Sequence, residues 1–241
     1  MTGASVIRQS RKTRRSRPCA VMRTENTTLI IDTGPDFRMQ LNELNIDNFD
    51  AVLYTHAHSD HIMGIDELRV VKVRHNKLID IYGNEETIEE LKQRFSYMFK
   101  DQNFYSKVLN PHIITAEDYG KTMRIGDINF TPFYQDHGNC DCIGYRFGNI
   151  GYSADMKHID EAAIKTLQGV DAWLADGAGH HIEDHATHAP LSRLYELNKQ
   201  IKAPKVYVVG LSKFMDYKLL AKELPEGFEP AYDGLRIAVS L

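Results

Sequence analysis

Apolar residues in the first half of the chain alternate between a strand-like and a helix-like period. Two β-rich runs separated by the turn-forming pair Glu25-Asn26 predict a hairpin. Apolar positions at helical spacing indicate two helices, and Asn84 is a suitable N-cap for the second. The strands predicted here are 19–24, 28–34, 51–55 and 78–83, and the helices are 37–46 and 84–99.

The second half begins with short strands and then alternates between helices and strands. The predicted strands are 112–116, 121–125, 128–134, 142–147, 150–154, 171–176, 205–210 and 235–240, and the predicted helices are 159–167, 191–201 and 216–224. Each half therefore holds a multi-strand sheet with helices. We predict an α/β (α+β) fold in which two sheets pack face to face under outer helices.

Composition is typical of a soluble globular protein. The 241 residues are 42% hydrophobic and 26% charged. No apolar stretch approaches the roughly 18 to 20 residues of a membrane span, and the start of the chain lacks the apolar region of a secretory signal. We expect a cytoplasmic protein without a membrane partner. The three cysteines, Cys19, Cys140 and Cys142, are too few for a disulfide framework and are interpreted as reduced thiols, with burial favoured over metal binding.

The net charge of −4 gives no general attraction to nucleic acid, so we do not expect a nucleic-acid partner. The exception is local, because a basic run is formed by Arg8, Arg11, Lys12, Arg14, Arg15 and Arg17. Its arginines could hold a phosphate-bearing substrate, whereas a solvated, partly disordered leader is the simpler interpretation. We expect 1–17 to be this leader and 18–241 to be a single domain.

Four ligand-type side chains follow the predicted strand 51–55 within six positions. They are His56, His58, Asp60 and His61. A strand end places side chains at the edge of a sheet, where α/β proteins bind ligands. Imidazole and carboxylate suit zinc, manganese, iron or nickel. Four such neighbours cannot all face one ion, so we expect one or two divalent ions, with further ligands at the strand ends 136–138 and 153–155.

These motifs resemble the metallo-β-lactamase fold. "THAHSDH" is similar to its H-x-H-x-D-H signature, and "DTG", "DHG" and "SAD" follow in the order found in that superfamily. The resemblance implies a four-layer αββα sandwich. It also implies ligand roles: His56, His58 and His137 for one ion, Asp60 and His61 for the other, and Asp155 as a bridge. Asp32 would orient the histidine loop.

Further segments resemble one branch of that superfamily. "RRSRP", "TGPDFRMQL", "HATHAPLSRLYEL" and "LPEGFEPAYDGL" are similar to the phosphoribosyl 1,2-cyclic phosphate phosphodiesterase branch, which is like the carbon–phosphorus lyase accessory protein. The resemblance implies hydrolysis of a small, cyclic phosphodiester by metal-bound hydroxide. It assigns proton transfer to His188, so Asp60 and His188 are the expected catalytic residues. His180, His181 and His185 are weaker candidates near the cleft.

Two departures from the superfamily pattern affect this prediction. The superfamily usually has a histidine ligand after a late strand, and Gly210 stands there. Water, substrate or His185 would have to replace it, so the second ion should bind more weakly or be absent. The start of the chain also lacks the glycine-rich turn and cysteines of many relatives, so we expect no structural zinc. An exposed sheet edge would then favour a homodimer.

Three alternatives to a phosphodiesterase remain open at this stage. The glycine at position 210, where the superfamily usually has a histidine ligand, favours a metal-binding protein with weakened or lost catalysis. A tRNA 3′-processing nuclease shares the signature, although no Gly/Pro-rich basic insertion for clamping its substrate is visible. A thiolester or lactone hydrolase would use the same metal chemistry on a carbonyl carbon.

Overall fold

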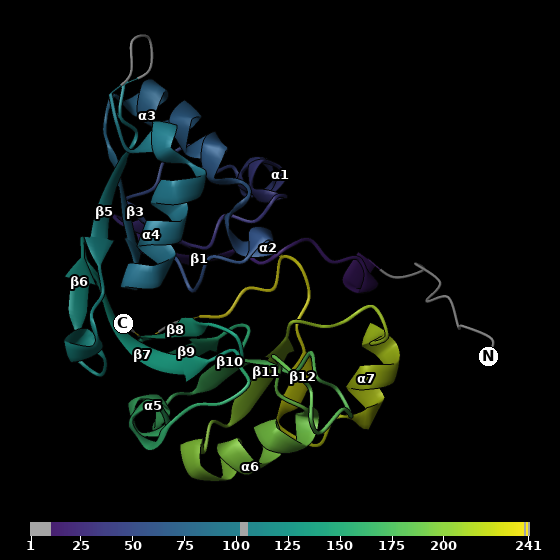
Figure 1. Cartoon of the computed structure of the whole chain (residues 1–241). Helices are drawn as coiled ribbons and strands as arrows, with labels where there is room; N and C mark the ends of the chain where they lie inside the picture. The colour runs from purple at the N-terminus through teal and green to yellow at the C-terminus, as the bar shows by residue number, and fades with distance from the viewer. Residues whose placement is uncertain (1–10, 102–105, 239, 241) are drawn as a thin grey trace. The chain divides into compact units, whose positions relative to one another are not determined.

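The chain divides into two compact units (Figure 1). The computed structural model describes residues 11–101, 106–238 and 240. One unit is Arg17–Pro132, called here the N-unit, and the other is Phe133–Leu241 with the segment before Arg17, called the C-unit. Residues 1–10 of the predicted basic leader lie outside the described residues.

A mostly parallel sheet forms the centre of the N-unit, in the order β1-β2-β3-β4-β5. Its strands are β1 (Ala20–Arg23), β2 (Thr28–Ile31), β3 (Ala51–Leu53), β4 (Ile79–Gly83) and β5 (Leu109–Ile113). The first two pair antiparallel, as expected for the predicted hairpin, and the later pairs are parallel. Parallel pairing brings the carboxyl ends of β2, β3 and β4 to one edge of this sheet.

Helices of the N-unit bury apolar residues against this sheet. They are α1 (Phe37–Leu44), α2 (Ser59–Ile62), α3 (Leu68–His75) and α4 (Glu85–Arg94), with 3-10 turns at Ile65–Glu67, Ser96–Met98 and Ala116–Asp118. Ile88 and Leu91 of α4 join Ile79 and Ile81 of β4 in one buried cluster. The side chain of Asn84 accepts a hydrogen bond from the Thr87 amide, so it caps α4 as predicted.

The C-unit is built on a second sheet, in the order β12-β11-β10-β9-β8-β7. Its strands are β7 (Ile128–Asp136), β8 (Asp141–Phe147), β9 (Ile150–Ser153), β10 (Ala172–Asp176), β11 (Lys205–Val209) and β12 (Phe228–Pro230). β7 begins in the N-unit, where it pairs antiparallel with β6 (Met123–Ile125). β9 to β12 pair in parallel, so their carboxyl ends also share one edge.

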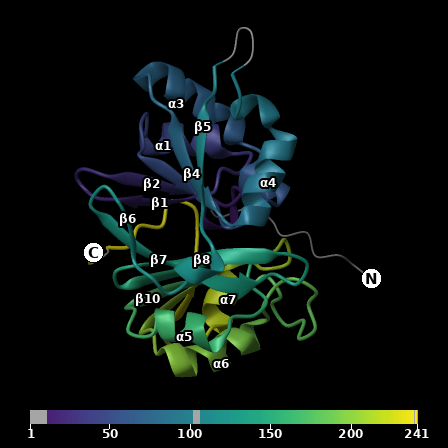
Figure 2. The same cartoon turned by 60° about the vertical axis from the view of Figure 1, so that its left-hand side comes forward.

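Three helices accompany the sheet of the C-unit: α5 (Glu161–Leu167), α6 (Leu191–Ile201) and α7 (Tyr217–Glu223). Figures 1 and 2 show α5 and α6 side by side over one face of the sheet. Leu167, Leu194 and Leu197 of these helices pack with Trp173 of β10 in the core of the unit. The Trp173 indole donates to the Ser153 hydroxyl over 2.9 Å, so its polar group is satisfied within the core.

The segment before Arg17 contacts the turn that follows β11. It contains a 3-10 turn at Arg11–Thr13. The Arg15 guanidinium donates to the backbone oxygens of Leu211 and Ser212 over 3.0 and 2.8 Å, and also to that of Met215. Arg15 therefore satisfies several carbonyl groups of the turn that follows β11.

Several predicted elements differ from the observed ones. The strand expected at 112–116 is β5, three residues earlier; it lies at a sheet edge, where Pro111 is tolerated. The helix expected to reach residue 99 ends at Arg94. The strand predicted at 235–240 is wrong, because residues 235–238 form no strand, and β12 takes the edge beside β11 instead. α3 and the 3-10 turns were not predicted.

The burial predicted for the cysteines is seen only in part. Cys142 is fully buried, whereas Cys19 and Cys140 are intermediate in exposure, and none of the three forms a disulfide. Within the described residues, we find no helix long and apolar enough to cross a membrane.

Candidate metal centre

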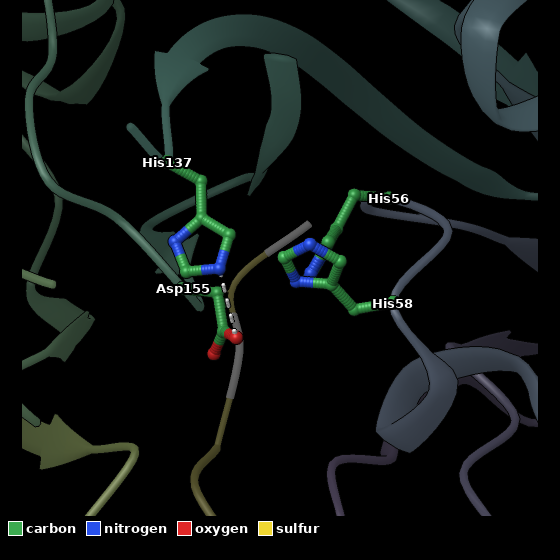
Figure 3. A group of neighbouring side chains, drawn as sticks. All are labelled: His56, His58, His137 and Asp155. Carbon is green, nitrogen blue, oxygen red and sulfur yellow. Dashed lines mark ion pairs between the residues drawn. The ribbon is translucent and has the colours of Figure 1, made fainter. Parts of the chain in front are cut away.

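The histidine loop of the N-unit connects β3 to α2. His56 and His58 lie in the loop, and α2 carries Asp60 and His61. His56 and His61 are almost completely buried. The ring centroid of His56 lies 4.5 Å from that of His58 and 4.2 Å from that of His61, so the loop and α2 together bring three imidazoles close to one another (Figure 3 draws His56 and His58).

Two glycines allow this loop to lie close to the end of β2. A Cβ atom on Gly34 would be 2.5 Å from the Asp60 carbonyl oxygen, and one on Gly64 would be 2.2 Å from the Gly34 oxygen. The Thr33 amide donates a hydrogen bond to the His61 carbonyl oxygen over 2.7 Å, and the Gly64 amide donates to the Thr33 oxygen over the same distance. The segment "DTG" is therefore required for close backbone packing beneath the histidines.

Asp32 is the buried carboxylate of this loop. It follows β2 with a φ of 61°, which an aspartate tolerates better than most residues. Its Oδ1 accepts from the Thr55 amide and its Oδ2 from the Thr55 hydroxyl, each over 2.8 Å. The His61 Nδ1 atom lies 2.7 Å from the same Oδ2. Asp32 thus contacts the histidine loop at both its start and its end.

These contacts determine the tautomers of two imidazoles. A carboxylate only accepts, so the Nδ1 of His61 carries the proton that it donates to Asp32. The single hydroxyl proton of Thr55 is donated to Asp32, so the Thr55 oxygen accepts from the His56 Nδ1 over 3.0 Å. In the neutral form of both rings, the lone pair is consequently on Nε2.

The carboxylate of Asp60 is half-exposed and paired with an arginine. Its Oδ2 lies 3.3 Å from Nη1 of Arg17, whose side chain is 61% exposed. The backbone of Arg17 is held more firmly, since its amide donates to Asp36 and its carbonyl accepts from Gln40. Arg17 is thus an arginine with a fixed backbone and a solvent-accessible guanidinium beside a predicted ligand.

His137 and Asp155 follow two strands of the C-unit, β7 and β9, that lie on either side of β8. His137 follows β7, and its Nδ1 donates to the Thr187 carbonyl over 2.7 Å, which again leaves the lone pair on Nε2. That Nε2 lies 3.6 Å from Oδ2 of Asp155, which follows β9 (Figure 3). Burial lowers the pKa of His137, although the Asp155 charge opposes the shift. A neutral imidazole next to a carboxylate is the form that binds a cation.

Asp176 and His188 form a second pair in the C-unit, and the sequence prediction missed its acidic member. Asp176 ends β10 and is completely buried. Its carboxylate accepts from the amides of Met156 and Ala178, each over 2.9 Å, and lies 2.6 Å from the His188 Nδ1. Burial raises the pKa of Asp176 to about 6. The sequence signal that could have identified Asp176 is its place as an acidic residue at the end of a predicted strand, which it shares with Asp32.

The two pairs belong to one group of possible ligands. Nitrogen or oxygen atoms of Asp155, Asp176 and His188 all lie within 4.8 Å of one another. The ring of His188 is 4.9 Å from that of His137, measured between centroids. The C-unit therefore brings two imidazoles and two carboxylates together.

Gly210 lies at the end of β11, next to this group. Its φ is +68°, and a Cβ atom there would be 2.5 Å from Oδ1 of Asp176. The position that a late-strand histidine would occupy is thus adjacent to a buried carboxylate. His185, the suggested substitute, accepts from the Thr187 and His188 amides through its Nδ1 over 3.3 and 3.1 Å.

The donors of both units fit divalent transition metals. Each unit supplies at least one buried imidazole whose Nδ1 atom is hydrogen-bonded, together with carboxylates. This is the arrangement by which proteins fix the coordinating nitrogen of a metal ligand. Asp32, Thr55 and Thr187 would be the residues that orient the ligands.

Sheets with outer helices and this donor set define a hydrolase of the metallo-β-lactamase fold. The chain belongs to the Beta-lactamase superfamily domain family, whose sequence model matches residues 27–210. The fold class predicted from the sequence is thereby confirmed, and this fold implies a divalent metal.

Individual relatives support the predicted branch. A crystal structure of a new diphosphatase from the PhnP family superposes with a TM-score of 0.85 and 28% identity, covering 97% of this chain and 88% of that one. An octanoyltransferase of Porphyromonas gingivalis is 27% identical over 96% of this chain, and the exodeoxyribonuclease YycJ of Bacillus anthracis is 24% identical over 66%. This chain spans only 46% and 58% of those two curated relatives. The resemblance to the PhnP branch is confirmed.

Proposed function

We propose that the protein is a metal-dependent phosphodiesterase acting on a small, cyclic phosphodiester. Two relatives support phosphorus chemistry, since one is named a diphosphatase and another an exodeoxyribonuclease. The observation that carries the proposal is that the imidazoles of His56, His61 and His137 are each hydrogen-bonded through Nδ1, which leaves the lone pair of the neutral ring on Nε2.

The proposed ligands follow from this orientation and from the family pattern. His56, His58 and His137 would hold one ion, Asp60 and His61 a second, and Asp155 would contribute to both. The ions would be zinc, manganese, iron or nickel, because imidazole and carboxylate donors suit these metals. When bound, such ions lower the pKa of water and neutralise charge on phosphoryl oxygens.

The chain's own residues would manage the proton and the substrate charge. His188 is held through Nδ1 by Asp176, so its Nε2 side can deliver a proton to the departing oxygen. The Asp176 carboxylate would stabilise the protonated ring while it holds that proton. Arg17 would attract the anionic phosphodiester toward Asp60.

The direct test is hydrolysis of bis(p-nitrophenyl) phosphate by full-length protein that is stripped of metal and then reloaded with each candidate ion. We expect activity that returns only with metal and falls at least about a hundredfold in His188→Ala and Asp60→Ala. His75→Ala, which removes a partly exposed imidazole at the end of α3, is the matched control. Full metal loading without hydrolysis of linear or cyclic diesters would instead favour a metal-binding protein with lost catalysis.

A second candidate is a thioester hydrolase. The octanoyltransferase relative matches 96% of this chain, and its name refers to acyl transfer. The same assays should therefore include an octanoyl thioester beside the phosphodiester and a tRNA precursor. Greater turnover of the thioester would replace the leading proposal, whereas preference for a small cyclic diester would support it.

A further inference from the structure

Two histidines and one glutamate form a group that shares no residue with the metal ligands proposed above. His180 and His181 belong to the loop between β10 and α6, and Glu223 is the last residue of α7. The possible ligand atoms of these residues all lie within 4.8 Å of one another. We propose that they form an additional binding site for a divalent transition metal of the zinc, nickel and copper class.

The distances match those of a shared ion. The Nε2 atom of His181 lies 2.8 Å from Oε1 of Glu223, and that of His180 lies 3.7 Å from Oε2. Two ligand atoms on a tetrahedral zinc ion, each about 2.0 to 2.1 Å from the metal, are about 3.3 Å apart. The observed separations bracket this value, so small side-chain rotations would give coordinating geometry.

The loop backbone holds the histidine pair in place. His180 has a φ of 51°, which is uncommon for a residue other than glycine. Its amide donates to the Gly177 oxygen over 2.9 Å, and its carbonyl accepts from the Leu191 amide over 2.8 Å. A Cβ atom on Gly179 would be 2.7 Å from the Ala189 oxygen, so the loop needs glycine to pack there. The rings of His180 and His181 are consequently 3.9 Å apart between centroids.

The electrostatic environment favours a cation at this position. Glu223 is placed at the C-terminus of α7, where the helix dipole disfavours a carboxylate and favours positive charge. A divalent ion would offset both charges. The His181 side chain is 65% exposed, so water can complete the coordination shell.

The donor set determines the class of metal. Two imidazoles and one carboxylate form a combination used by zinc proteins. Among first-row divalent ions, such nitrogen-rich sites bind copper, nickel and zinc more tightly than manganese. The same loop carries His185 and His188, so an ion bound here would join that loop to α7.

The test compares metal binding by full-length wild type, His181→Ala and Glu223→Gln. Each protein is stripped with chelator and titrated with zinc, and bound metal is counted by mass spectrometry of the dialysed protein and by calorimetry. We expect both variants to lose one zinc equivalent or to bind it at least tenfold more weakly. His75→Ala and Glu226→Gln remove a partly exposed imidazole and an exposed carboxylate elsewhere, and should bind as wild type does.

A second measurement identifies the ligands independently of stoichiometry. Zinc should shift the imidazole proton resonances of His180 and His181 in the nuclear magnetic resonance spectrum, and these shifts should be absent in Glu223→Gln. Equal zinc stoichiometry and affinity in wild type and in both variants would overturn the proposal. Unchanged imidazole resonances at full zinc loading would also overturn it.

Discussion

The Nδ1 atom of His188 lies 2.6 Å from a carboxylate oxygen of Asp176, and that carboxylate is completely buried. Two backbone amides, those of Met156 and Ala178, donate to the same group. The histidine is therefore oriented by an acid that is itself fixed by the backbone of two strand ends. This pairing gives the His188 ring a fixed orientation.

The ionisation of Asp176 should affect stability in a predictable direction. Its pKa is raised to about 6 by burial, so the folded protein retains its proton over a range in which the unfolded chain, with a pKa of 3.8, has lost it. The stabilisation that the protonated Asp176 gives the folded state is fully present below the pKa of Asp176 in the unfolded chain. It is lost as the pH rises through the pKa of Asp176 in the folded protein. In metal-free protein, stability relative to Asp176→Asn should fall by about 3 kcal/mol between pH 3.5 and 7, taking roughly 1.4 kcal/mol per pKa unit.

Urea unfolding of wild type and Asp176→Asn at several pH values measures this difference. Taking the difference cancels the groups that titrate equally in both proteins. Asp171→Asn, at an exposed position just before the same strand, is the control and should show no such trend. A stability difference that rises with pH would contradict the raised pKa.

Asp32 should support metal binding without being a ligand. Replacing it with asparagine removes the carboxylate that accepts from His61 and from the Thr55 hydroxyl. We expect metal affinity to fall about ten- to a hundredfold, the usual effect of losing a group that orients a ligand. Competition with a chromophoric chelator measures it, and Asp50→Asn in the same unit is the comparison. Unchanged affinity would show that the histidine loop keeps its geometry without Asp32.

Arg17 should distinguish anionic from neutral substrates. Its guanidinium lies beside Asp60 and is largely exposed, so it can bind a phosphoryl oxygen. Arg17→Ala should lower kcat/KM for an anionic phosphodiester about ten- to a hundredfold, as expected for one charged hydrogen bond. It should leave turnover of an uncharged ester nearly unchanged. Equal losses on both substrates would mean that Arg17 acts by positioning Asp60.

Gly210 should tolerate substitution poorly. Alanine there would incur the left-handed backbone penalty of about 1–2 kcal/mol and would also contact Asp176. Gly169, with a φ of +78° and nothing within 4 Å of its Cβ position, provides a matched control with the backbone penalty alone. Urea unfolding should show a larger loss for Gly210→Ala than for Gly169→Ala. Equal losses would mean that Asp176 moves away at little cost.

The same geometry changes how Gly210→His should be interpreted. A histidine at this position would complete the superfamily pattern, and that pattern alone predicts a stronger second metal site. Its Cβ would instead meet the carboxylate that holds His188. That substitution would therefore disturb the Asp176–His188 pair.

Much of the fold could be predicted because local signals and tertiary structure agree. The hairpin, the capped helix α4 and the strand before the histidine loop each have a clear period or a turn signal. β12 was missed because its three residues include a proline and pair only at a sheet edge. The strand predicted at 235–240 had a strand-like composition, but composition alone does not provide a pairing partner.

The site was predicted where ligand-type residues cluster in sequence and was incomplete where they do not. His56, His58 and His61 lie within six positions of the sequence, so they could be recognised as possible ligands. Asp176 is isolated in sequence, and only the parallel order of β9, β10 and β11 brings it to Asp155 and Gly210. The Arg17–Asp60 pair is likewise separated by 43 positions. Contacts between distant strand ends depend on sheet order, which a single sequence does not specify.

The attachment of Arg15 to the turn at 211–215 has a consequence for biosynthesis. A ribosome adds about 5 to 20 residues per second, and Leu211 follows Arg15 by 196 positions. Arg15 must therefore wait roughly 10 to 40 s for its carbonyl partners. During translation, the segment around Arg15 therefore reaches its final contacts late, after residues 211–215 have been made.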